Sequence, residues 1–231
     1  LSPEELATIL IRGVRKQPKS FSEYFEKRRY DLPPLPNLYF MRDSAFVFRN
    51  VLFLSSMAHA VRRGETLLTE LAVRFSGEYD VERAVSLDGS IEGGDIAVLS
   101  GTHLLAGISQ RTSPESLDTL ARYAAEAAGE PVTVIALVLP AERSTIHLDM
   151  VFTQLDRELA LVHGRSLKGA PVLRLEAYPD GSRELWEEPS LPKALERVGL
   201  PMEFVYCGGA DPVSSDREQW LAAANTVALA P

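Results

Sequence analysis

A histidine and an aspartate stand two residues apart in the segment 145–152, where apolar and polar residues alternate. Read as a β-strand, this segment places His147 and Asp149 together on one face, because successive side chains of a strand point to opposite faces. An imidazole beside a carboxylate can transfer protons next to a bound cation. Taken alone, the pair is more typical of a hydrogen-bonded structural pair on a solvated face.

The segment 91–96, Ile-Glu-Gly-Gly-Asp-Ile, contributes a second acidic candidate. Gly93 and Gly94 allow a tight turn and a close approach of the backbone to another group. Glu92 lies at the edge of that turn. In isolation the motif favours a surface hairpin turn.

The segment 36–43 reads as a strand over 37–40 that ends near Asp43. Asn37 and Tyr39 would share one face of it, and Phe40 the other. An aspartate beside a large aromatic ring can hold and cover a planar cation. The alternative is an edge strand with a solvated charged end.

Two arginines precede predicted helices. Arg62 comes shortly before a helix over 65–74, and Arg111 before a helix over 114–128. An arginine near the beginning of a helix could bind a ligand carboxylate there. For either residue alone, a solvated loop charge is the favoured interpretation.

Short strands and single helices must position these residues. The helix over 114–128 has the clearest signals, with Ser113 as its cap and Gly129 as its stop. The helix over 65–74 is expected to turn Leu67, Leu68 and Leu71 inward, and a third helix is expected over 191–198. Strands are expected at 37–40, 45–56 with a turn at 49–50, 96–99, 104–108, 132–139, 145–152, 158–162, 171–177, 202–207 and 225–230. This alternation predicts an α/β fold.

The N-terminal 32 residues differ from the rest. Ser2 and Glu5 are expected to form a capping box at the start of a helix, with Pro3 at its first position. Residues 16–31 are polar and aromatic, with a helix expected in their second half. Elsewhere, the Gly-Gly pairs at 93–94 and 208–209 hint at an internal repeat.

Composition restricts the classes of partner. The chain has 231 residues with 24 Lys+Arg and 32 Asp+Glu, a net charge of −8. Such a chain is a poor candidate for binding nucleic acid or an anionic membrane surface, but it suits a cationic ligand. The single cysteine, Cys207, excludes a disulfide within the chain and indicates a reducing compartment, which we expect to be the cytoplasm. No apolar run approaches the roughly 20 residues of a membrane helix.

Together and in this order, the motifs resemble those of the arginine deiminase family over residues 33–231. The shared motifs are Asn-Leu-Tyr-Phe-x-Arg-Asp at 37–43, Arg-Arg-x-Glu-Thr-Leu-Leu at 62–68, Glu-Gly-Gly-Asp at 92–95, Arg-Thr-Ser at 111–113, His-Leu-Asp-x-Val-Phe at 147–152, Glu-Gln-Trp at 218–220 and Asn-Thr-Val-Ala-Leu-Ala-Pro at 225–231. The resemblance implies a pentein-like αβ-propeller of repeated ββαβ units. Residues 33–231 would form an incomplete catalytic propeller domain, and residues 1–32 the end of a helical insertion.

The resemblance also implies an activity, the hydrolysis of L-arginine to L-citrulline and ammonia through a covalent cysteine intermediate. It implies no metal and no cofactor, and it suggests a homo-oligomer. By the resemblance, Asp43 and Asp149 would bind the substrate guanidinium, and His147 would be the general acid/base with Glu92 as its hydrogen-bond partner. The α-carboxylate and backbone part of arginine would be contacted by Asn37, Arg62 and Arg111. The aliphatic stem of arginine would pack against Phe40.

One part of the implied site is missing from this sequence. In the family, the nucleophilic cysteine comes from a C-terminal loop after the strand that ends in Ala-Leu-Ala-Pro, where this sequence stops at Pro231. Cys207 belongs to an earlier Val-Tyr-Cys-Gly-Gly segment and is expected to be a buried neutral thiol. We therefore expect a fragment that is inactive alone.

Two other functions remain open at this stage. The complete protein could be another guanidino-modifying hydrolase or an amidinotransferase, which substrate profiling would distinguish. It could also be an inactive protein that binds a guanidino ligand or a partner protein, which the absence of a C-terminal cysteine from the parent gene would favour.

Overall fold

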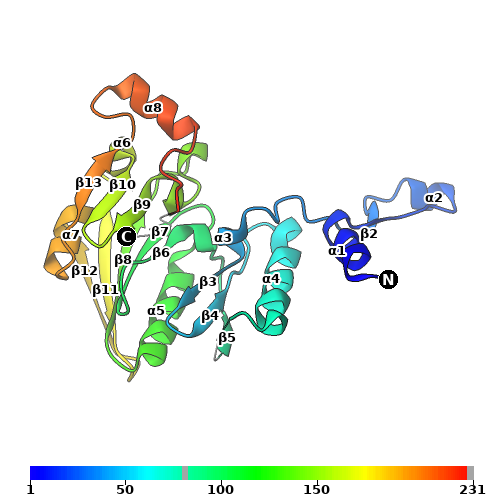
Figure 1. The fold of residues 1–231 in the computed structure, drawn as a ribbon, viewed down its shortest axis with the longest axis horizontal. Helices are drawn as coiled ribbons and strands as arrows, with labels where there is room; N and C mark the ends of the chain where they lie inside the picture. Colours follow the sequence, from blue (N-terminus) through cyan, green and yellow to red (C-terminus); the bar gives the residue numbers. More distant parts are fainter. Residues whose placement is uncertain (80–82, 228–231) are drawn as a thin grey trace.

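Three strand–strand–helix–strand units follow one another along the chain in a computed structural model that describes residues 1–79 and 83–227 (Figure 1). In each unit the first two strands are antiparallel, and the last strand runs parallel to the second. This ββαβ repeat is the one expected from the sequence.

The first unit contains β3 (Ala45–Phe48), β4 (Val51–Leu54), α4 (Arg63–Ser76) and β5 (Arg83–Ser86). All four residues of β4 are buried, which explains why the segment is continuously apolar. The turn between β3 and β4 lies at Arg49 and Asn50, as predicted, and Arg49 has a φ of 54°. The 3₁₀-helix η1 (Ala60–Arg62) leads into α4.

The second unit contains β6 (Ile96–Val98), β7 (His103–Ile108), α5 (Pro114–Ala128) and β8 (Val132–Val138). The predicted bounds of α5 are confirmed. The side chain of Ser113 accepts a hydrogen bond from the backbone N–H of Ser116, and Gly129 ends the helix with a φ of 67°. The apolar face of α5 packs against the sheet in one hydrophobic cluster.

The third unit contains β9 (Phe152–Asp156), β10 (Leu159–Val162) and β13 (Glu203–Tyr206). Between β10 and β13 lie α6 (Gly164–Leu167), the hairpin of β11 (Val172–Ala177) and β12 (Arg183–Glu188), and α7 (Leu191–Arg197). Strand β11 pairs with β8, so the hairpin extends the second unit's sheet to the order β12-β11-β8-β7-β6. Helix α8 (Pro212–Trp220) follows β13.

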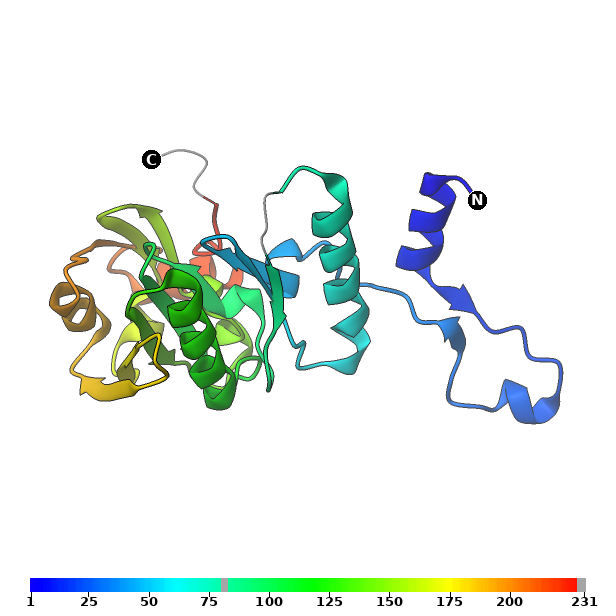
Figure 2. The same cartoon turned by 90° about the horizontal axis from the view of Figure 1, so that it is seen from below.

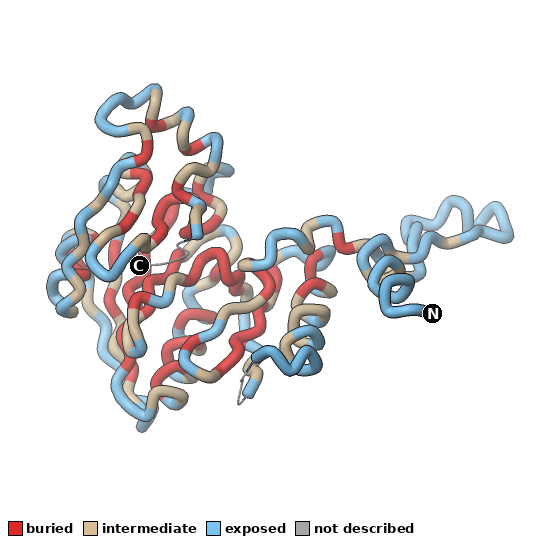
Figure 3. Tube along the Cα trace, in the orientation of Figure 1, coloured by how far each residue is buried: buried red, intermediate tan, exposed pale blue. Residues whose placement is uncertain are grey.

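The N-terminal residues extend away from the three units (Figures 1 and 2). They form α1 (Pro3–Arg12), β1 (Val14–Arg15), α2 (Phe21–Tyr24) and β2 (Tyr30–Leu32). The predicted capping box of α1 is confirmed, and no residue of α1 is buried. The helix expected in the second half of 16–31 is wrong, because the helical residues of this segment are Phe21–Tyr24, and the chain after them is not helical. Figure 3 shows this arm almost wholly exposed.

Several local predictions are wrong, and the first two concern the candidate residues. The segment 37–40 is a turn that leads into a short helix, α3 (Met41–Ser44). The segment 145–152 contains the 3₁₀-helices η3 (Arg143–Thr145) and η4 (Leu148–Met150), and a strand begins only at Phe152. No strand is assigned over 225–227, and the rest of the strand expected at 225–230 lies outside the described residues.

Of the three leucines expected to face inward on helix α4, only Leu68 is half-buried. Leu67 and Leu71 are 56% and 41% exposed, whereas Glu65 is fully buried. The side chain of Thr69 lies 2.7 Å from the hydroxyl of Ser44. The inner face of α4 is therefore partly polar, because it contacts the short turn that carries Asp43.

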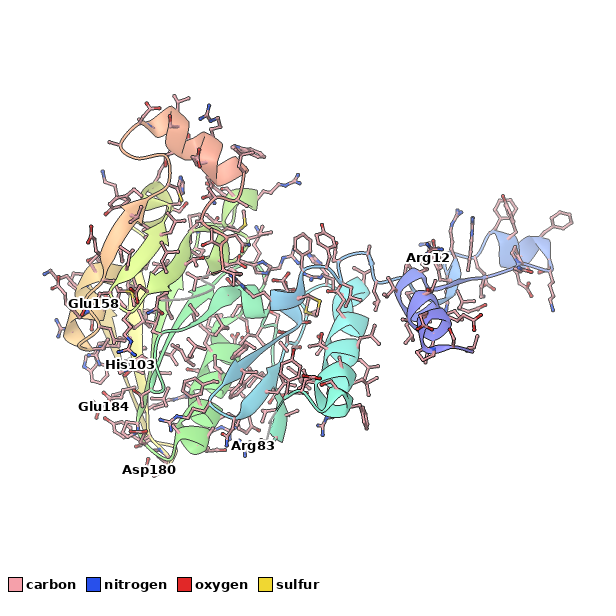
Figure 4. All side chains as sticks on the ribbon, viewed as in Figure 1. Arg12, Arg83, His103, Glu158, Asp180 and Glu184 are labelled. Atoms are coloured by element: carbon pink, nitrogen blue, oxygen red, sulfur yellow. The ribbon has the colours of Figure 1, made fainter. Side chains whose placement is uncertain are left out.

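The outer ends of the strands carry exposed charges. Figure 4 labels Arg83 on β5 and Asp180 and Glu184 at the tip of the β11–β12 hairpin, all at the periphery. Glu184 and its neighbours make β12 a charged edge strand, which disfavours pairing with another chain. Among the described residues, no helix has the length and apolar character needed to cross a membrane.

Candidate active site

Three short turns bring the candidate catalytic residues together, and each turn leads into the first strand of a unit. Asp43 lies in α3 before β3, Glu92 precedes η2 (Gly93–Asp95) and β6, and His147 and Asp149 lie at η4 before β9. The three turns contact one another. Equivalent positions in a repeated unit thus converge, which places residues more than one hundred positions apart in one buried cluster.

His147 is hydrogen-bonded to Glu92 through Nε2 and Oε2, 2.8 Å apart. The other ring nitrogen, Nδ1, lies 3.8 Å from Oδ1 of Asp43. Burial would lower the pKa of His147, but its hydrogen bond to the Glu92 carboxylate and the other nearby carboxylates raise that pKa above its ordinary value. Burial would likewise raise the pKa of Glu92, yet His147 and Arg111 hold it below its ordinary value. The pair is therefore stabilised as imidazolium and carboxylate.

Gly93 and Gly94 serve the packing of these turns. A Cβ atom on Gly94 would lie 2.7 Å from Oδ1 of Asp43 and 3.0 Å from the ring of His147, and one on Gly93 would overlap the carbonyl of Arg42. The hairpin turn expected here is wrong, because η2 is a buried 3₁₀-helix. The two Gly-Gly pairs differ in conformation, since Gly208 and Gly209 have positive φ values in a turn after β13 and Gly93 and Gly94 do not. The internal repeat at which they hinted is present in the three ββαβ units.

Replacing Gly94 by alanine is expected to separate Asp43 from His147 and to lower the free energy of unfolding by about 1–3 kcal/mol, as overpacking does elsewhere. Gly101→Ala is a matched control, because its Cβ would meet only the Arg49 side chain, at 3.5 Å. Thermal unfolding of both variants measures the difference. Equal stability of the two would contradict this close approach.

Arg62 lies among three carboxylates. Its Nη1 is 2.8 Å from Oδ2 of Asp43 and 3.5 Å from Oε2 of Glu92, and its Nη2 is 2.7 Å from Oε2 of Glu65. Only 4% of the residue is exposed. Burial would lower the pKa of Arg62, but Glu65 and Asp43 raise it, so the guanidinium stays charged. A contact with a substrate carboxylate remains a prediction that requires Arg62 to leave these partners.

Asp149 is paired on one oxygen only. Its Oδ2 lies 3.4 Å from Nη1 of Arg42, whereas its buried Oδ1 has no hydrogen-bond partner among the described residues. Burial raises the pKa of Asp149 to about 6, although His147 and Arg42 oppose that rise. A pocket of about 490 Å³ is lined by Asp149, Arg42 and Gly94. The unpaired oxygen is thus an acceptor for which a ligand could supply the donor.

The other predicted substrate contacts surround this cluster more loosely. Nη1 of Arg111 lies 3.6 Å from Oε1 of Glu92. The ring of Phe40 is about half exposed, and the guanidinium of Arg62 lies 5.9 Å from its centre. Asn37 lies in the turn before Phe40 and is bonded to it through the backbone. Their roles as substrate contacts stay predictions.

Three residues of the cluster were not among the predicted site residues: Glu65, Asp95 and Arg42. Asp95 is fully buried, and its carboxylate accepts hydrogen bonds from the backbone N–H of Leu148 and from the hydroxyl of Ser109. It therefore joins η2 to η4. Burial raises the pKa of Asp95 to about 6. Asp95 and Glu65 both stand in motifs quoted for the resemblance, and this was the signal that could have found them.

One group in the described part of the chain has ligand atoms close enough for a metal ion: those of Asp43, Glu92 and His147 lie within 4.8 Å of one another. Arg62 already binds the carboxylates of Asp43 and Glu92, so a metal ion would have to displace a positive charge. The geometry fits a planar guanidinium with paired hydrogen bonds better than a metal ion.

Cys207 follows β13 and is 5% exposed. Burial raises the pKa of its thiol, and Glu218 adds to the rise. A thiol with a raised pKa is a weak nucleophile at neutral pH, as the sequence predicted for this residue.

Comparison with known proteins identifies the family. The model of the family described as "Arginine deiminase" matches residues 9–231. The chain belongs to the arginine deiminase family. It is 32% identical over 247 residues to the arginine deiminase of Limosilactobacillus reuteri (strain DSM 20016) and 33% identical over 249 residues to that of Oenococcus oeni (strain ATCC BAA-331 / PSU-1). Each match covers 100% of this chain and 60% of the relative, so the chain spans about 60% of the length of these arginine deiminases.

Solved structures support the fold of this arginine deiminase family member. Unliganded AgrE matches 86% of this chain and 25% of its own with a TM-score of 0.58 at 20% identity. The N-terminal domain of ArgZ, an arginine dihydrolase from the ornithine-ammonia cycle in cyanobacteria, matches 84% of this chain and 59% of its own with a TM-score of 0.56 at 17% identity. The expected α/β class and partial pentein-like propeller are thereby confirmed.

Proposed function

We propose that the complete protein hydrolyses L-arginine to L-citrulline and ammonia through a covalent cysteine intermediate, and that this chain supplies the guanidinium-binding and proton-transfer half of the site. The observation that carries the proposal is the buried cluster of Asp43, Glu92, His147 and Asp149, in which Oδ1 of Asp149 lacks a donor among the described residues. A substrate guanidinium is a cation that presents several N–H donors in one plane.

The cluster suits the chemistry of a guanidinium. Its central carbon is a weak electrophile because resonance spreads the positive charge. In our proposal Asp43 and Asp149 fix the cation by charge-assisted hydrogen bonds and present its carbon to a thiolate from another part of the protein. His147, kept protonated beside Glu92, donates a proton to the departing ammonia and then takes one from the attacking water.

The substrate contacts are also proposals. Arg111 is the better placed of the two predicted arginines to meet the α-carboxylate, because it is only loosely paired with Glu92, at 3.6 Å. Arg62 would first have to give up its bonds to Asp43 and Glu65. Phe40, half exposed beside the cluster, can pack on the aliphatic stem, and Asn37 lies next to it.

Calorimetric titration of this chain with L-arginine tests the binding half of the proposal. We expect saturable binding of L-arginine and much weaker binding of L-citrulline, whose ureido group has almost the same shape and no charge. The Asp149→Asn variant should lose most of the affinity for L-arginine. Equal binding of both ligands, or undiminished binding by the variant, would overturn the proposed guanidinium grip.

The affinity for L-arginine should also depend on pH. Burial raises the pKa of Asp149 to about 6. Above that pH the buried carboxylate is ionised, which lowers the stability of the ligand-free protein, and a bound cation offsets this loss. As the pH falls through about 6, Asp149 becomes neutral, and the affinity should decrease by up to roughly tenfold per pH unit. Titrations across this range measure the change. An unchanged affinity would contradict the role of Asp149.

A further inference from the structure

A second pocket, of about 460 Å³, lies outside the catalytic cluster where α8, η3 and the beginning of α6 meet. Two of its lining residues, His163 and Gln219, are 4% and 3% exposed. Within residues 1–79 and 83–227, Nε2 of His163 and Oε1 of Gln219 have no hydrogen-bond partner. Two buried side chains that line one pocket, each with an unpartnered polar atom, point to a ligand there, because buried polar groups are normally hydrogen-bonded.

The remaining polar atoms of these two side chains are engaged. Nδ1 of His163 lies 2.8 Å from the hydroxyl of Ser166. The amide nitrogen of Gln219 donates to the carbonyl of Ser144, which leaves its oxygen as an acceptor. Burial lowers the pKa of His163, so its ring is neutral, and Nε2 can carry a proton if the hydroxyl of Ser166 donates to Nδ1.

Charges of both signs surround these atoms. Arg143 and Glu142 line the pocket from the η3 side, while Arg165 and Asp216 line it as an ion pair of 2.7 Å. A purely anionic or purely cationic ligand would meet like charges here. A small molecule that carries one charge of each sign would find a complement for both.

We propose that this pocket binds a free α-amino acid, with its ammonium group on Oε1 of Gln219 and its carboxylate between Nε2 of His163 and the guanidinium of Arg143. The probe of choice is an amino acid without a guanidinium or ureido group, because the catalytic cluster has no complement for its side chain. L-Alanine meets this requirement.

The same two residues hold the catalytic segment at both of its ends. Gln219 binds the carbonyl of Ser144, and the backbone N–H of His163 donates to the carbonyl of Val151 over 2.9 Å. His147 and Asp149 lie between these two anchors. A ligand that bridges His163 and Gln219 would therefore contact the residues that anchor both ends of this segment.

NMR titration of the chain with ¹⁵N-labelled histidine tests the proposal. L-Alanine is expected to shift the ring signals of His163 in a saturable manner. Propionate lacks the ammonium group and ethylamine lacks the carboxylate, so neither should do so. The Arg143→Ala variant, changed at an exposed position, should keep its fold and bind L-alanine several-fold more weakly.

The absence of a saturable shift at His163 would overturn the proposal and assign the two polar atoms to ordered water. Equal shifts with propionate would overturn it as well and assign them to an anion. His163 reports on this pocket independently of His147. A failure of arginine to bind the catalytic cluster would therefore leave this result intact, and the two proposals are tested separately.

Discussion

Replacing His147 by asparagine in the complete protein is expected to lower kcat for arginine by roughly 10²–10⁴-fold, the usual contribution of a general acid/base. The imidazole lies 2.8 Å from Glu92 and 3.8 Å from Asp43, which places it to transfer a proton beside a bound guanidinium. Asparagine retains a polar side chain of similar reach but cannot titrate. KM should change much less than kcat, because Asp43 and Asp149 remain to bind the guanidinium.

His103→Asn is the matched control for that experiment. His103, labelled in Figure 4, lies at the beginning of β7 and is bonded to Ser100 and Thr102. The strand residue that pairs with Ile96, next to η2, is Ala106, three residues further along β7. Its replacement should leave kcat within about twofold of the wild type, as expected for a surface change away from the site. Similar losses in both variants would indicate general destabilisation, and unchanged turnover in His147→Asn would remove His147 from the mechanism.

Replacing Arg62 by methionine is expected to lower the free energy of unfolding by about 3–5 kcal/mol, which is the usual cost of removing one partner from a buried ion cluster. Asp43, Glu65 and Glu92 would then lie together without their shared cation, and Glu65 and Glu92 are fully buried. Chemical unfolding of this chain measures the change. Because methionine preserves most of the side-chain volume, the loss of stability reflects the missing charge rather than poorer packing.

Two further variants make this test specific. Arg74→Met removes an exposed arginine from the adjacent helix α4, whose ion pair among the described residues is with Glu70 four residues earlier, and it should cost less than about 1 kcal/mol. The double variant Arg62→Met with Glu65→Gln should recover part of the stability, because one uncompensated carboxylate is removed. An Arg62→Met chain as stable as Arg74→Met would show that the buried carboxylates do not need this guanidinium.

The regular elements were predictable where an apolar stripe with marked ends, or a continuous apolar run, shows how the element is buried. Helix α5 combines an apolar stripe with Ser113 and Gly129 at its ends, so its bounds follow from local chemistry. Strand β4 is apolar throughout because it is covered on both faces. Strand β12 was missed because its residues, from Arg183 to Glu188, are mostly polar at an exposed sheet edge.

The candidate site residues were proposed from motif order, and the structure brings them together, but their local structure was not predictable. His147 and Asp149 alternate with apolar residues as in a strand, yet they lie at a 3₁₀-helix whose backbone is held by Asp95. That hydrogen bond joins residues 53 positions apart, and no local pattern contains it. The inward face of α4 was misassigned for the same reason, since Glu65 is buried only because it meets Arg62.

A citrulline assay on the complete protein is the most direct test. Incubated with L-arginine, that protein should release citrulline and ammonia in equal amounts, and its Asp149→Asn and His147→Asn variants, shown to fold, should release almost none. We expect the buried carboxylates around His147 to bind the planar guanidinium of L-arginine. A folded, complete protein that forms no citrulline, or an Asp149→Asn variant as active as the wild type, would contradict this.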